Sequence, residues 1–75
     1  MGALKIKHYL EANYKASVFM LLTPECAELS FQSYLFNALD IENQQIILSL
    51  LSDYDKERTE FYYIEEWTHG IRIKY

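Results

Sequence analysis

The chain has 75 residues, one cysteine, two histidines and a formal net charge of −4, and 51% of its residues are hydrophobic. This length predicts a single compact domain over residues 1–75, and so many apolar residues exclude a disordered tail. The small acidic charge gives no general attraction to nucleic acid or to an anionic membrane. No apolar stretch is long enough to predict a membrane span, and the start of the chain has no signal-peptide pattern.

The single cysteine bears on the cellular compartment. Cys26 has no second cysteine to pair with, so no internal disulfide can form. This composition favours a reducing, cytoplasmic setting in which packing alone holds the fold together.

Residues 4–18 alternate in polarity, with apolar side chains at most even positions and lysines among the odd ones. A period of two is typical of a half-buried strand. A three-residue loop at 11–13 would place apolar opposite apolar throughout, so the pattern predicts a β-hairpin with one polar face.

Two helices are predicted next. Thr23 can cap a helix, and Pro24 suits the first helical position. Together they favour a helix over residues 24–38. Leu29 and Phe36 form a second apolar stripe on it, which we expect to be left exposed for a partner or a second copy. Asp40 can cap another helix, from about 41 to 54.

The C-terminal part predicts a second hairpin, with strands at 60–67 and 71–75 joined by a loop at 68–70. Gly70 would supply the left-handed residue of that loop. The competing interpretation is a helix from about 56 to 69 that ends at Gly70.

Together these elements predict an α+β fold of order ββααββ. Two hairpins form a four-stranded antiparallel sheet, and two helices pack on one face of it. The pattern leaves the strand order open.

On this architecture most basic residues fall on the exposed sheet face, with tyrosines that could stack on bases. This surface predicts nucleic-acid binding as the alternative function, whereas the competing interpretation is an ordinary solvated face. The candidate nucleic-acid residues are Lys5, Lys7, Tyr9, Lys15, Arg72 and Lys74.

The sequence carries no motif that indicates catalysis. Its two glycines cannot form a phosphate loop, and His8, Cys26 and His69 lack the spacing of metal ligands. We therefore expect no catalytic, cofactor-binding or metal-binding residues, and no enzyme.

The leading prediction is a small, non-enzymatic protein-interaction module. Seven Tyr, four Phe and one Trp are many for so small a core, and Tyr and Trp are enriched at interfaces. Short acidic chains without motifs are common among phage and mobile-element inhibitors, so an inhibitor, antitoxin, immunity protein or adaptor is expected, and a homodimer is left open. The predicted partner-binding residues are Leu29, Phe36 and Tyr62.

Overall fold

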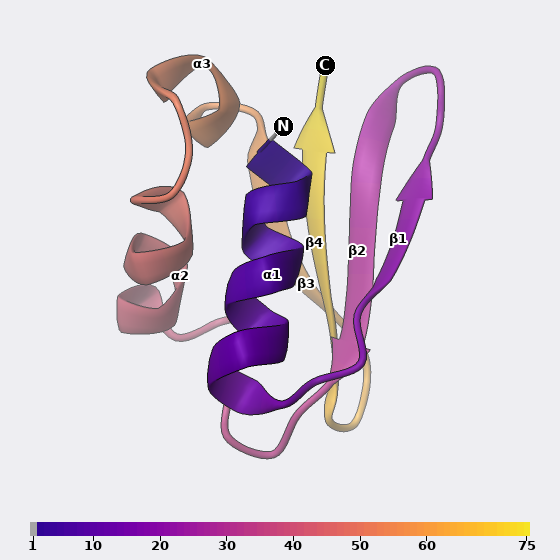
Figure 1. The fold of residues 1–75 in the computed structure, drawn as a ribbon, viewed down its shortest axis with the longest axis vertical. Helices are drawn as coiled ribbons and strands as arrows, with labels where there is room; N and C mark the ends of the chain where they lie inside the picture. The colour runs from indigo at the N-terminus through magenta and orange to yellow at the C-terminus, as the bar shows by residue number, and fades with distance from the viewer. Residues whose placement is uncertain (1) are drawn as a thin grey trace.

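The computed structural model describes residues 2–75, which form one four-stranded sheet and three helices (Figure 1). The strands are antiparallel in the order β1-β2-β4-β3. This confirms the predicted α+β fold and its ββααββ order, which here follows an additional N-terminal helix. The elements are α1 (Gly2–Tyr14), β1 (Phe19–Leu22), β2 (Cys26–Gln32), α2 (Ile41–Leu48), α3 (Asp53–Lys56), β3 (Thr59–Glu65) and β4 (Thr68–Lys74).

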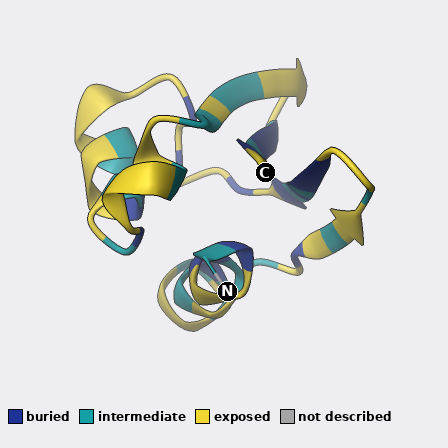
Figure 2. Cartoon of the chain, turned by 90° about the horizontal axis from the view of Figure 1, so that it is seen from above, coloured by how far each residue is buried: buried dark blue, intermediate teal, exposed yellow. Residues whose placement is uncertain are grey.

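The core lies between the sheet and the helices α1 and α2, which are on the same side of it (Figure 2). The central strands β2 and β4 pair from Cys26↔Lys74 to Gln32↔Thr68. The other side, here called the open face, carries none of the helices that residues 2–75 form (Figure 2). The core-facing row of the central strands comprises Ala27, Leu29, Phe31, His69, Ile71 and Ile73.

Residues 2–14 form helix α1, so the hairpin predicted over 4–18 is wrong. Ile6 and Leu10 are buried, while Leu4 and His8 are exposed. A spacing of four fits a helix as well as a strand, because four is close to one helical turn and is also an even number. The helix formers Ala, Leu, Lys and Glu dominate this segment, and a Lys7–Glu11 ion pair of 2.8 Å spans one turn.

The helix predicted over 24–38 is also wrong, because this region contains strand β2. Thr23 Oγ1 accepts the N–H groups of Glu25 and Cys26, and Thr23 N–H donates to Cys26 O at 2.9 Å. These are contacts of a tight turn between β1 and β2. A turn and a helix start use the same capping chemistry and the same proline position, so Thr23-Pro24 fits both.

The helix predicted over 41–54 is present in two pieces. Asp40 caps α2 as expected, with its Oδ1 accepting Glu42 N–H at 2.8 Å. The chain then turns at residues 49–52, where Ser49 Oγ donates to Ile46 O at 2.6 Å and Ser52 caps α3. Local serine hydrogen bonds compete with helix continuation and account for the break.

The second hairpin is confirmed, and the alternative helix over 56–69 is excluded, but the predicted register is wrong. The turn is at Glu66 and Trp67, and Phe61 pairs with Ile71. Gly70 lies within β4 at a negative φ, where an added Cβ would overlap the ring of Tyr62. Gly70 is therefore required for space under an aromatic ring and not for a left-handed turn.

Replacing Gly70 by alanine should expose this constraint. We expect Gly70→Ala to lower the free energy of unfolding by about 1–3 kcal/mol, since the ring of Tyr62 must move. Urea denaturation of wild type, both single variants and Gly70→Ala/Tyr62→Ala measures the coupling. The alanine at position 70 should cost much less when Tyr62 is already truncated, and an unchanged cost would contradict the packing argument.

Candidate protein-binding surface

The predicted partner-binding residues do not share a surface. Leu29 is fully buried in β2, and Phe36 is buried among aromatic rings, so neither forms an exposed stripe. That prediction depended on a helix that is a strand, in which Leu29 takes the inward alternate position. Tyr62 is partly exposed and lies on the open face, above Gly70.

The predicted nucleic-acid residues are also dispersed. Lys5, Lys7 and Tyr9 are on α1, and Lys15 follows its end. These four residues therefore lie off the sheet surface on which Arg72 and Lys74 stand, and the prediction of one basic sheet face is wrong. Its physical cause is again the helix, which carries the lysines away from the strands.

The two remaining basic residues of the open face are matched by carboxylates. Glu60 Oε1 lies 2.7 Å from Lys74 Nζ, and Glu60 Oε2 lies 3.7 Å from Arg72 Nη1. Glu28 lies 3.4 Å from Arg72 Nε, and the Arg72 guanidinium is 5.0 Å from the ring centre of Tyr62. The centre of the open face is therefore balanced in charge.

Lys74 determines the acidity of Glu60. The hydrogen bond and the charge of Lys74 hold the pKa of the Glu60 carboxyl below its usual value. A depressed folded-state pKa contributes stability above the unfolded pKa, and this contribution is lost as the pH falls through the folded value. We expect Lys74→Gln to raise the Glu60 pKa, measured by NMR titration of its carboxyl carbon. An unmoved titration curve would show that Lys74 is not the cause.

The β3–β4 turn lies beside the loop of residues 33–40 at one end of the molecule (Figure 1). Exposed aromatic side chains are carried by both segments. Tyr34 and Leu35 are 78% and 80% exposed, and Trp67 is 46% exposed. The rings of Tyr34 and Trp67 are in contact, with centroids 5.0 Å apart. We call Tyr34, Leu35, Tyr63 and Trp67 the aromatic end.

Hydrogen bonds hold the loop of the aromatic end against the hairpin. Ser33 N–H donates to Trp67 O at 2.9 Å, and Ser33 Oγ accepts the N–H groups of Leu35 and Phe36. Tyr63 donates its hydroxyl to Asn37 Oδ1 at 2.6 Å. The exposed side chains are therefore presented by an ordered backbone, which lowers the entropy lost on binding.

Trp67 has an unfavourable backbone conformation. Its φ is 63°, a left-handed value that glycine or asparagine adopts more readily than a bulky residue. Such strain costs on the order of 1–3 kcal/mol and is concentrated at functional sites. Trp67 is 46% exposed, so nearly half of its surface is left free to contact another molecule.

His69 connects the aromatic end to the core. It is almost fully buried, and its Nε2–H donates to the Ser33 carbonyl at 3.1 Å. The centroid of its ring lies 5.5 Å from the ring centroid of Phe31, 5.6 Å from that of Phe36 and 4.9 Å from that of Tyr63. His69 therefore fixes the start of the loop by a direct hydrogen bond from a buried ring.

Replacing His69 should loosen the loop. We expect His69→Leu to lower the free energy of unfolding by about 1–3 kcal/mol, because the buried Ser33 carbonyl loses its partner. Urea denaturation measures this change, and faster amide exchange in residues 33–40 reports the loosened loop. His8→Leu is the matched control, since His8 is exposed on α1. Equal effects of the two changes would contradict the assignment.

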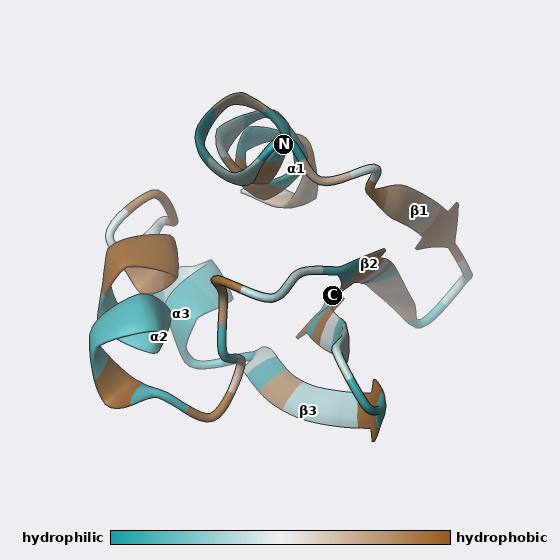
Figure 3. Cartoon of the chain, turned by 90° about the horizontal axis from the view of Figure 1, so that it is seen from below, coloured by the Kyte–Doolittle hydropathy of each residue, from teal (hydrophilic) through white to brown (hydrophobic). Residues whose placement is uncertain are grey.

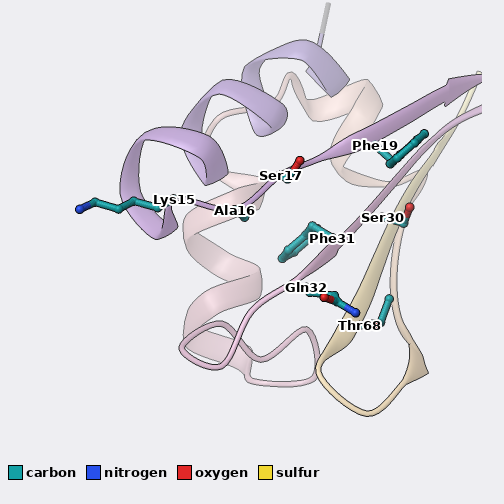
Figure 4. A pocket seen from close by; sticks show the side chains of 8 residues that line it. All are labelled: Lys15, Ala16, Ser17, Phe19, Ser30, Phe31, Gln32 and Thr68. Carbon is teal, nitrogen blue, oxygen red and sulfur yellow. The ribbon is translucent and has the colours of Figure 1, made fainter.

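A shallow hollow of about 430 Å³ lies between the α1–β1 connection and β2 (Figure 4). Lys15 contributes to its rim, but its side chain points away from the other labelled residues (Figure 4). Cys26, expected in a helix, is instead a buried residue at the start of β2. Within residues 2–75, no three His, Cys, Asp or Glu side chains are arranged to hold a metal ion.

No family model, curated protein or solved structure matches this chain. None of the helices in the part of the chain that the structure describes is long and apolar enough to cross a membrane.

Proposed function

We propose that this protein is a small non-enzymatic interaction module that binds a partner protein through the aromatic end. The observation that carries the proposal is Trp67, a half-exposed tryptophan in a left-handed backbone conformation. The backbone conformation favours a glycine or asparagine there, and the exposed part of the indole is available to contact a partner.

The composition and order of the surface support this assignment. Trp and Tyr are enriched among the residues that contribute most to binding energy, and they cluster in the centre of interfaces. Tyr34 and Leu35 stand beside Trp67 on a loop held by Ser33 and Asn37. A rigid patch of large apolar side chains binds with a small entropy cost.

The charges around the patch indicate the chemistry of the partner. Glu65 and Glu66 adjoin Trp67, and with Tyr63 they line a depression of about 360 Å³. Carboxylates at the rim of an apolar patch favour a partner with an apolar pocket and basic residues around it. We therefore expect association to slow as salt concentration rises.

Size and charge support the proposed class of the module. A 75-residue acidic chain with net charge −4 suits an inhibitor or adaptor, of the kind that phages and mobile elements direct at host enzymes, or an antitoxin or immunity protein. The single buried cysteine suits a reducing cytoplasm. A partner enzyme that loses activity in the complex would distinguish inhibitor from adaptor.

Trp67→Gly separates binding from folding. Its free energy of unfolding should stay within about 1 kcal/mol of wild type, because relief of backbone strain offsets the lost Tyr34 contact. Partner affinity should fall about thirtyfold or more, the loss expected for a central aromatic residue. Affinity capture from the native host, followed by titration of the captured protein, measures the change.

Tyr54→Ala is the matched control, because Tyr54 is an exposed aromatic residue on α3, outside the aromatic end. It should leave partner capture unchanged. Capture that survives Trp67→Gly would overturn the proposed surface. Salt-sensitive binding to single-stranded nucleic acid that requires Lys5 and Lys7 would favour the alternative function instead.

A further inference from the structure

The two edges of the sheet differ in how they are protected. The edge strand β3 carries Glu60 and Glu65, and its pairing with β4 is interrupted by a register shift between Tyr63 and Glu65. Charged side chains and bulges are the devices that prevent an edge strand from pairing with another chain.

The edge strand β1 has neither device. Its sequence is Phe-Met-Leu-Leu, without a charge or a proline, and it pairs with β2 in an uninterrupted register. Phe19 is 78% exposed and Leu21 is 59% exposed, and both lie on the open face. Figure 3 shows β1 hydrophobic along its length at the free edge of the sheet.

The backbone of β1 has hydrogen-bonding groups to offer at this edge. Thr23 N–H donates to Cys26 O, so this pair is a hydrogen-bonded one. Bonded and non-bonded pairs alternate along an antiparallel ladder. The pairs of Leu21 and Phe19 with β2 are then bonded, and the backbone N–H and C=O groups of Met20 and Leu22 point outward.

We propose that β1 pairs antiparallel with β1 of a second copy of this chain, about a two-fold axis at Met20. This axis is perpendicular to the sheet, so the open faces of both copies lie on the same side. Opposite residues of an antiparallel pair share a face, so the residue at the axis must pair with its own copy. At Met20, the outward backbone groups of the two copies bond to each other. Phe19 of each copy then lies opposite Leu21 of the other.

The charges that flank β1 favour this arrangement. Lys15 precedes the strand and Glu25 follows it, and residues 16–24 carry no charge. An antiparallel pair about Met20 brings Lys15 of each copy to the same end as Glu25 of the other. The segment is therefore complementary to itself in charge as well as in hydrophobicity.

The size of the contact predicts a weak dimer. Stable specific interfaces bury about 1,200–2,000 Å² in total. Two four-residue strands with their flanking side chains fall at or below the lower end of that range. The result is a continuous sheet of eight strands, four from each copy, that forms as protein concentration rises.

Sedimentation velocity of the full chain over a wide concentration range tests the proposal. Wild type should shift from monomer to dimer, and amide exchange at Met20 and Leu22 should slow as the dimer forms. Leu21→Lys should weaken the dimer tenfold or more, because it places a charge among the apolar side chains of the contact and sets two like charges near the axis. Leu35→Lys makes the same chemical change at the aromatic end and should leave dimerisation unchanged.

A charge exchange provides a second readout that does not depend on Leu21. Lys15→Glu and Glu25→Lys should each weaken the dimer, and the variant that carries both changes should recover it. A protein that stays monomeric at every concentration overturns the proposal and leaves the edge free for a different partner. A dimer that is lost in Trp67→Gly but retained in Leu21→Lys also overturns it, and places self-association at the aromatic end.

Discussion

The rest of the structure depends on the pairing of β2 with β4. These strands are separated along the chain by α2, α3 and β3, yet they match over seven positions in the centre of the sheet. Their inward side chains form the face of the sheet on which α1 and α2 pack. On this face Leu29 lies opposite Ile71, and Phe31 lies opposite His69. Each hairpin contributes one strand to this centre and leaves its other strand at an edge.

This arrangement determines which surfaces are available for contacts. Both helices cover the same side of the sheet, so the open face must be stabilised by its own side chains. Tyr62 fills the space above Gly70, and the carboxylates of Glu28 and Glu60 neutralise Arg72 and Lys74. Among the large exposed apolar side chains, Phe19 and Leu21 lie at the β1 edge, and Tyr34, Leu35 and Trp67 lie at the aromatic end. These are the two surfaces where contacts with other molecules are proposed.

The sequence predicts the class of the fold better than the location of its first elements. The sequence predicts Asp40 as a helix cap and predicts the C-terminal hairpin, because capping and strand alternation depend on neighbouring residues. Residues 4–18 were ambiguous, because Ile6, Leu10 and Tyr14 are spaced by four, which suits a helix and a strand equally. The helix formers of this segment and the Lys7–Glu11 pair favour the helix, and the exposure of Leu4 and His8 agrees with it.

The candidate site was harder to predict than the fold. Trp67 was expected within a strand, and its left-handed conformation has no signal in a sequence that offers Gly70 three residues later. Similarly, the role of Ser33 depends on His69, 36 residues away, and no local pattern joins them. The inward position of Phe36 follows from the same long-range contacts, so a local pattern does not predict its burial.

The place of β4 in the sheet has a consequence for protein synthesis. β4 is made after α1, β1 and β2, and it is also a central strand that both hairpins require. Until β4 has been made, α1, β1 and β2 have no central strand to complete their core, and the apolar edge of β1 is already present. Because contacts of large sequence separation form slowly, we expect the core to close late in folding. During that interval the apolar edge of β1 is open to pairing with other chains.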